Sequence, residues 1–301
     1  MIASLLAAFF FALTATCGSY NVRANGPVRG NIGRLCVAAV VLGLFAHMWG
    51  NGFASASVAW FLMSGVLGMG IGDIGVYAAL PLLGSRLTVL MTQCLAAPIA
   101  AVGEWLWLGT RLTAAQILWG VVILGGVVLA LMPSKASPPR VIVRPAGYVF
   151  GLLAAVGQGI GALLSRKGVM VATAAGETVQ SPVFGVNAAY HRIFAGLVFV
   201  VLWFALMRAL GRMPVPVTPP TRVHGFRWIV ASGLTGSVVG VGCYQWALAT
   251  SPSGLVLPIA ATAPLLAMPI TYWLEGDRPS RRAVVGGVVA VAGCVALTLA
   301  R

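Results

Sequence analysis

The side chains best suited to chemistry in this sequence are polar residues inside long apolar stretches. Asp73 lies in GMGIGDIGVYAAL (Gly68–Leu80), seven residues before Leu80, which places it about 10 Å inside the predicted helix end. Exposing an ionised acid to lipid there costs about 2.5–3.5 kcal/mol, so we expect Asp73 to face protein or a wet cavity. It could contact a substrate cation or carry a proton, it could be a structural partner of Arg34 or Arg192, or it could lie close enough to the lipid headgroups to be solvated.

Tyr77 follows Asp73 by one helical turn and therefore lies on the same helix face. Gln93 and Gln158 lie near the middle of apolar runs, and Tyr244 and Gln245 repeat this pattern in the second half. Such residues either line a cavity or form hydrogen bonds between helices, worth about 0.6–2 kcal/mol; Tyr77 could equally be an interfacial aromatic. The candidate cavity or coupling residues are Asp73, Tyr77, Gln93, Gln158, Arg34, Arg192, Tyr244 and Gln245.

Arg34 and Arg192 are expected to begin their helices, where an arginine either extends to the lipid headgroups or binds a ligand. Glu104 lies near a predicted helix end beside Trp105 and Trp107, and this neighbourhood predicts an interfacial position.

The composition predicts which elements must hold these residues. The 301-residue chain is 59% hydrophobic and only 8% charged, with a mean hydropathy of +0.97, which is typical of a membrane protein. The apolar runs are too long and too continuous for a transmembrane β-barrel. We therefore expect an all-α integral membrane fold of about ten transmembrane helices. The predicted helices are Ile2–Tyr20, Ile32–Met48, Ser57–Leu80, Leu87–Leu108, Ala114–Met132, Ala146–Ser165, Gly185–Met207, Phe226–Thr250, Gly254–Leu274 and Ala283–Ala300.

The formal net charge of +14 comes from single basic residues scattered among the predicted loops, which argues against a nucleic-acid partner. Fourteen of the nineteen fall on one side of the predicted membrane and five, Arg111, Arg166, Lys167, Arg192 and Arg301, on the other. Basic residues favour the cytoplasmic side, so the charge count places both termini outside.

An internal repeat organises the chain. At an offset of 167 residues Gly75 aligns with Gly242, Tyr77 with Tyr244, and Gly120 with Gly287. We expect a five-helix repeat at 1–132, a connection at 133–145 and a second five-helix repeat at 146–301. Because each copy has an odd number of helices, the second must enter the membrane from the opposite side, which gives an inverted repeat typical of secondary transporters.

The glycines and prolines indicate packing and kinks. Gly70, Gly72 and Gly75 match the dinucleotide-binding pattern G-x-G-x-x-G, but that pattern needs a strand before it, and here it lies inside an apolar run. We interpret the glycines as close helix contacts of the small-x-x-x-small type. The packing glycines are Gly68, Gly72, Gly236 and Gly240, and the prolines expected to kink the fourth and ninth helices are Pro98, Pro258, Pro264 and Pro269.

The segments Tyr77–Leu131 and Tyr244–Ala300 resemble the EamA repeat of the drug/metabolite transporter superfamily. The resemblance is carried by YAAL and YQWAL at the end of the third helix of each copy, by a proline in the next helix, and by LGTRL and EGDRPS before a glycine-spaced fifth helix. The acid of the family's Gly-Glu pair is replaced by Thr110 in the first copy and by Asp277 in the second. Members of this family usually keep both termini in the cytoplasm, opposite to the charge count.

The resemblance implies a secondary transporter that exports a small organic solute, such as an amino acid, a metabolite or an amphipathic drug, by alternating access, with protons as an optional coupling ion. A multi-pass protein of a cell membrane, the bacterial inner membrane, is expected. We expect no metal or cofactor, because the cysteines and histidines show no ligand spacing, and no enzymatic activity, because the five acids are spread over the chain and do not form a catalytic group. A non-transporting accessory or scaffold protein stays an alternative, a membrane enzyme a weaker one, and the sequence does not distinguish a monomer from a homodimer.

Overall fold

The computed structural model describes residues 1–132, 142–211, 225–275 and 280–299, and within these ranges every regular element is helical. Ten segments are long and apolar enough to cross a membrane, which confirms the predicted fold class. The elements are α1 (Ile2–Asn25), α2 (Pro27–Met48), α3 (Val58–Gly65), η1 (Val66–Ile71), α4 (Gly72–Leu108), α5 (Ala114–Leu131), α6 (Pro145–Ala174), α7 (Pro182–Ala209), α8 (Gly225–Ser232), η2 (Gly233–Gly240), α9 (Val241–Thr250), α10 (Ser253–Ala260), α11 (Ala263–Glu275) and α12 (Arg281–Leu299).

Several helices begin earlier than the apolar runs predict, because local capping residues extend them. Pro27 and Pro182 occupy the first turns of α2 and α7, where a missing backbone N–H does no harm. The Ser181 hydroxyl also accepts a hydrogen bond from the Phe184 N–H, 3.1 Å away. The expected starts at Ile32 and Gly185 were therefore several residues late.

The third and eighth spans each contain a π-helical segment. In the third span, Val58–Gly84, η1 lies between α3 and α4, and in the eighth, Gly225–Thr250, η2 lies between α8 and α9. Val66 and Gly233, where the two segments begin, are separated by the 167-residue offset of the repeat. π segments are rare and occur often at functional sites. Their presence at corresponding positions indicates that both halves have the same local helix geometry there.

The predicted proline kinks have different outcomes. The ninth span is broken at Ala261–Thr262 between α10 and α11, with Pro264 in the first turn of α11, while Pro258 lies inside α10 and Pro269 inside α11. Pro98 lies inside α4 with helical backbone around it, so it does not interrupt the fourth span as expected. The non-helical residue of α4 is Gly84, whose φ of 77° suits glycine alone and separates the third and fourth spans.

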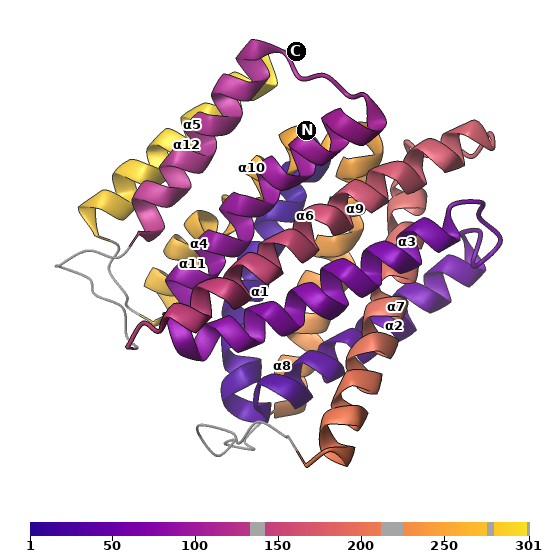
Figure 1. Cartoon of the computed structure of the whole chain (residues 1–301), viewed down its shortest axis with the longest axis horizontal. Helices are drawn as coiled ribbons and strands as arrows, with labels where there is room; N and C mark the ends of the chain where they lie inside the picture. The colour runs from indigo at the N-terminus through magenta and orange to yellow at the C-terminus, as the bar shows by residue number, and fades with distance from the viewer. Residues whose placement is uncertain (133–141, 212–224, 276–279, 300–301) are drawn as a thin grey trace.

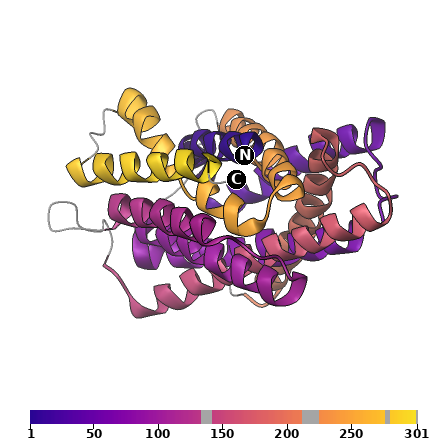
Figure 2. The same cartoon turned by 90° about the horizontal axis from the view of Figure 1, so that it is seen from above.

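The two halves interlock. α6, which opens the second half, packs against α3, η1 and α4 of the first, whereas α1 packs against α8, η2, α9, α10 and α11 of the second. α2 pairs with α7, and α5 pairs with α12 at the upper left of Figure 1. Figure 2 shows the same exchange, with the indigo start of the chain beside orange helices of the second half. The two halves therefore pack together as one helical body.

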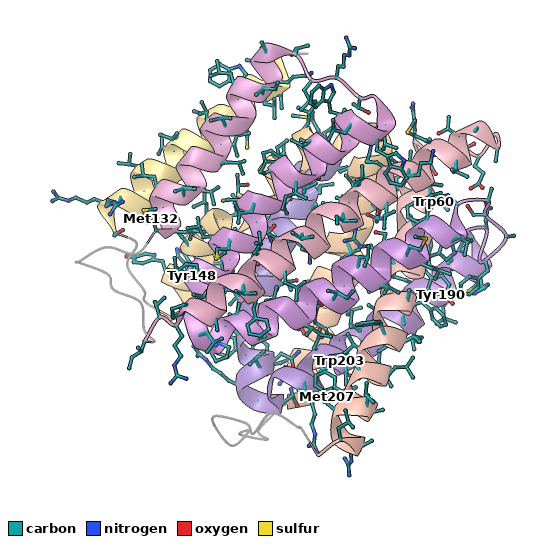
Figure 3. The ribbon with its side chains drawn as sticks, in the orientation of Figure 1. Trp60, Met132, Tyr148, Tyr190, Trp203 and Met207 are labelled. Carbon is teal, nitrogen blue, oxygen red and sulfur yellow. The ribbon has the colours of Figure 1, made fainter. Side chains whose placement is uncertain are left out.

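The interior is rich in small residues, and many large apolar side chains lie on the exterior. Most buried hydrophobic residues are alanines, whereas many valine, leucine and tryptophan side chains are exposed. Small residues allow helix backbones to approach closely within a membrane. Figure 3 shows side chains projecting outward from the helices, with Trp60 at the upper right of the view and Trp203 and Met207 near the bottom. This distribution suits contact with lipid.

The packing glycines contact helices of the opposite half. A Cβ on Gly161 of α6 would lie 3.0 Å from the Cα of Gly68, and one on Gly157 would lie 2.9 Å from the Cα of Gly72. A Cβ on Gly240 would lie 2.8 Å from the Phe11 ring of α1, and one on Gly236 would overlap Thr14. The glycines thus lie at two of the contacts between the halves, that of α6 with η1 and α4 and that of α1 with η2.

Candidate functional site

An ion pair between Arg34 and Asp73 lies where the halves meet. Arg34 Nη2 donates to Asp73 Oδ2 at 2.8 Å, Nε donates to Asn31 Oδ1 at 2.9 Å, and Nη1 donates to Ser237 Oγ at 3.1 Å. α2 supplies Asn31 and Arg34, α4 supplies Asp73 immediately after η1, and η2 of the other half supplies Ser237. The ion pair is therefore completed by a hydroxyl of the second half.

Arg192 forms a second polar cluster. Its Nη1 donates to Ser165 Oγ at 3.4 Å and to Gln245 Oε1 at 3.3 Å, and Gln245 Nε2 donates to Ser165 Oγ at 3.1 Å. The guanidinium carbon lies 5.5 Å from the centroid of the Tyr244 ring, within cation–π range. Ser165 also shares a 2.8 Å hydrogen bond with Ser64 of α3. The cluster thus joins α6, α7 and α9 to the first half.

The Arg192 guanidinium fits because the facing helix has glycine there. A Cβ on Gly68 would lie 2.5 Å from Arg192 Nη2, and one on Gly161 would lie 3.3 Å from it. The Gly68 carbonyl, inside η1, accepts a hydrogen bond from Gln158 Nε2 at 3.1 Å. Side chains of neighbouring helices often satisfy carbonyl groups where a membrane helix departs from α geometry. Gln158 therefore fastens the π segment to α6.

A family model described as the EamA-like transporter family matches residues 1–132 and 145–299. The chain belongs to the EamA-like transporter family. A search of curated proteins finds no match to this EamA-like chain. A solved structure described as "Crystal structure of protein" is similar to it with a TM-score of 0.73, covering 99% of this chain and 96% of the other at 16% identity. At that identity the likeness supports the fold alone.

The structure corrects the expected positions of both arginines in this EamA-like chain. Arg34 lies seven residues after Pro27 and Arg192 ten residues after Pro182, so neither begins its helix. Arg192 is only 2% exposed, and its guanidinium binds protein groups. The headgroup interpretation is therefore wrong for Arg192, and Arg34 is held by Asp73 and Ser237 instead.

Asp73 lies deeper than predicted. The third span continues to Gly84, eleven residues beyond Asp73, which at 1.5 Å per residue is about 16 Å. Asp73 is 9% exposed. Its pairing with Arg34 agrees with the interpretation of Asp73 as a structural partner. Because Asp73 also lies at the contact between the halves, a role in proton coupling remains a proposal.

Of the remaining candidate residues, some take part in the two polar clusters and others do not. Gln158, Tyr244 and Gln245 take part in the contacts described above, and Gln158 acts as the predicted link between helices. Gln93, in α4, is partly buried. The side chain of Tyr77 lies outside the part of the chain that the structure describes.

Glu104 was expected at the membrane interface, but it is buried at 2% exposure in a second ion pair. Arg166 Nε of α6 donates to Glu104 Oε1 at 2.9 Å, and the Ser253 N–H donates to Glu104 Oε2 at 2.7 Å. The Ser253 hydroxyl is also hydrogen-bonded to Oε2, and Arg166 Nη1 donates to the Leu248 carbonyl. A carboxylate at the start of α10 is favoured by the helix dipole. The pair fastens α4 to α6 and α10.

Arg166 was not among the residues predicted to lie at a site, although its place in the sequence gave an indication. Arg166 and Lys167 directly follow the predicted end of a helix at Ser165, but α6 continues to Ala174. Lys167 Nζ lies 5.9 Å from the ring centroids of half-buried Trp60 and exposed Trp107. One of the adjacent cations therefore lies by two aromatic rings, while the other is bound inside.

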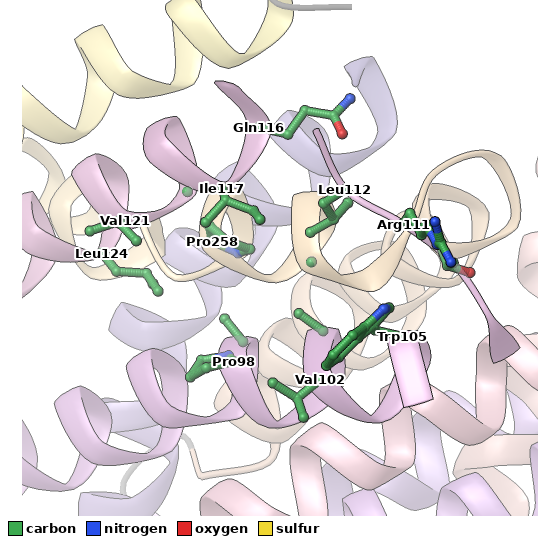
Figure 4. A pocket seen from close by; sticks show the side chains of 15 residues that line it. Pro98, Val102, Trp105, Arg111, Leu112, Gln116, Ile117, Val121, Leu124 and Pro258 are labelled. Carbon is green, nitrogen blue, oxygen red and sulfur yellow. The ribbon is translucent and has the colours of Figure 1, made fainter. Parts of the chain in front are cut away.

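A large apolar groove of 740 Å³ lies between α4, α5 and α10. Figure 4 shows Pro98 and Pro258 on its walls, with Trp105 and Arg111 toward one end. A similar groove of 690 Å³ lies between α11 and α12, and Pro98, Gly120 and Leu124 of the first correspond at the 167-residue offset to Leu265, Gly287 and Val291 of the second. Asp73 and Arg192 line neither groove.

Within the described residues, His, Cys, Asp and Glu form no group of three that could hold a metal ion.

Proposed function

We propose that this chain is a secondary transporter that moves a small organic solute by alternating access. The observation that carries the proposal is the meeting of polar side chains from both halves at the Arg34–Asp73 pair and the Arg192 cluster. Inverted repeats place the solute site of secondary transporters at the repeat interface near the membrane midplane. Here Arg34 and Asp73 of the first half contact Ser237 of the second.

Access to this region requires helix movement, because Asp73 is 9% and Arg192 2% exposed. The π segments η1 and η2 lie in corresponding places of the two halves and contact α6 and α1. Each is a place where the hydrogen-bond ladder of its span changes register, and such places suit hinges. Movement about η1 and η2 would open the site to one side and then to the other.

Export from the cytoplasm across a bacterial inner membrane is the proposed direction and location, following the family's expected behaviour. The proposed solute is an amino acid, a related metabolite or an amphipathic drug. A proton is the proposed coupling ion, with Asp73 as its carrier. The small-molecule solute itself follows from membership of a transporter family.

A thermal-shift screen of the purified protein against a metabolite library tests this proposal. A solute that binds the folded state raises apparent stability by mass action, by about 2.7 kcal/mol at a hundred times its Kd. Each hit is then tested for counterflow in proteoliposomes, and we expect exchange of labelled for unlabelled solute. Stability independent of every solute, with no counterflow, would contradict transport and favour an accessory protein, whereas electrical conductance far above carrier turnover would indicate a channel.

A further inference from the structure

Arg192 lies deep inside the protein, where its guanidinium is hydrogen-bonded to neutral groups and also interacts electrostatically with Asp73, whose salt bridge is with Arg34. Arg192 is ten residues from the start of a 28-residue helix, about 15 Å along its axis. Its Nη1 donors reach the neutral oxygens of Ser165 and Gln245, and its Nε is buried without a hydrogen-bond partner in the described part of the chain. Because a guanidinium stays protonated in proteins, this position holds a full positive charge.

The acids whose side chains the structure describes are bound elsewhere. Asp73 pairs with Arg34, and Glu104 pairs with Arg166. Glu177 accepts hydrogen bonds from the Ser55 hydroxyl and the Ala56 N–H, in the loops that follow α2 and α6. The salt bridges of the described residues therefore leave Arg192 without a paired carboxylate.

The internal repeat indicates what is missing beside Arg192. Arg34 and Arg192 are the corresponding arginines of the second and seventh helices, and Asp73 neutralises Arg34. At the 167-residue offset, the position of Asp73 corresponds to Gly240, so the second half has no acid there. A buried charge in a membrane is costly unless it is paired. The second half thus repeats the cation and omits its anion.

We propose that Arg192, with Gln245 and Ser165, binds the carboxylate of an organic anion, so that the transported solute supplies the negative charge that the chain lacks. This inference rests on the proposed function and specifies its solute class. A guanidinium binds a carboxylate through two parallel hydrogen bonds, and the unpartnered Nε of Arg192 is one available donor. The Tyr244 side chain is itself hydrogen-bonded to Arg192, and its ring, 6.1 Å from the Phe11 ring of α1, supplies a flank for the rest of the solute.

The test compares matched acids and amides by thermal shift. The probes are L-leucine with L-leucinamide, and phenylacetate with phenylacetamide. We expect each acid to raise Tm of the wild-type protein and its amide to leave Tm unchanged. Arg192→Gln should weaken carboxylate binding at least about tenfold, the factor that one hydrogen bond to a charged group supplies. Arg192→Lys should restore part of the response, because it keeps the charge without the two-point geometry.

Gln245→Glu is the second variant and does not depend on the folding of Arg192→Gln. It places a carboxylate where the Gln245 Oε1 now lies, 3.3 Å from Arg192 Nη1, and so provides an internal anion. We expect this variant to be at least as stable as the wild type and to lose its response to the acids. Arg111→Gln is the control, because it removes an exposed cation that takes no part in the contacts described for this cluster and should respond to the acids as the wild type does.

Equal shifts with acids and amides, a full acid response in Arg192→Gln or Gln245→Glu, or no shift with either acid would each overturn the inference. The proposed function has a separate readout. Counterflow of a neutral solute by the same preparation would reject the carboxylate site while supporting transport, whereas absence of counterflow for the whole library would reject transport itself.

Discussion

Arg34 Nη2 and Asp73 Oδ2 lie 2.8 Å apart, and this contact joins the second span to the third directly beside a π segment. Ser237 of the second half binds the same guanidinium. Movement of one half against the other would therefore change the contacts of this ion pair. The pair is suited both to stabilise the folded protein and to couple proton binding to that movement.

Asp73→Asn should abolish proton-coupled transport while the protein still folds. The amide keeps the size of the side chain but cannot carry the proton, and it leaves Arg34 without its anion. The measurement is the uptake of the identified solute into proteoliposomes under an imposed pH gradient. Asp73→Glu, which keeps the carboxylate, is the control and should retain coupling. Wild-type rates and pH dependence in Asp73→Asn would remove Asp73 from the mechanism.

Glu104→Gln should destabilise the folded protein, because Arg166 would lose its buried anion. Breaking a buried ion pair costs about 3–5 kcal/mol, and the amide, which can still accept hydrogen bonds, should bring the loss to the lower end of that range. Unfolding of the single variants and of Glu104→Gln with Arg166→Gln gives a double-mutant cycle. The double variant should lose less than the sum of the two single losses. Additive losses would show that the pair does not stabilise the fold.

Gly75→Ala should destabilise the contact between α4 and α6. A Cβ at this position would lie 2.8 Å from the Ala154 backbone nitrogen and 2.9 Å from the Phe150 carbonyl oxygen, so the helices must separate, at a cost of about 1–3 kcal/mol.

Gly125→Ala is the matched control for Gly75→Ala, since a Cβ there meets nothing within 4 Å. Alanine is favoured over glycine in helices by about 1 kcal/mol, so this control should be neutral or stabilising. Thermal unfolding of both variants measures the difference, and equal Tm values would show that the α4–α6 contact tolerates a side chain at Gly75.

The positive-inside rule makes a prediction about orientation. Of the nineteen basic residues, Arg34, Arg166 and Arg192 are bound inside the protein. Of the others, thirteen fall on the side of the loop at 133–145 and three on the side of the termini. Alkaline phosphatase fused after Arg301 should therefore be active, because it lies outside the cytoplasm, and a fusion within the 133–145 loop should be inactive. The reverse pattern would support the family orientation, with both termini in the cytoplasm.

The number of spans could be predicted from the sequence because it depends on apolar length alone. Helix ends were predicted less well, since Arg34 and Arg166 looked like loop residues although their charges are bound inside the protein. Glu104 was misplaced for the same reason. Its partners Arg166 and Ser253 are 62 and 149 residues away in the sequence. A local sequence pattern does not predict contacts between residues so far apart in the chain.

The sequence predicted which residues would lie at the candidate site, but it did not predict which of them contact each other. Asp73, Gln158 and Gln245 stood out as polar residues in apolar runs, and the structure gives each a partner on another helix. Which arginine binds Asp73 depends on how α2, α7 and α4 pack, and one sequence does not contain that information.

η1 also changes which face of the third span the later residues occupy, since Gly68 lies inside η1 whereas Gly72 and Gly75 lie in α4. Each α-helical residue advances by about 100° around the axis, and a π turn takes in one extra residue. Residues after η1 are therefore rotated by about that angle relative to an unbroken α-helix that started at Val58. The span thus carries two helical phases, and substitutions before and after η1 can change its opposite ends independently.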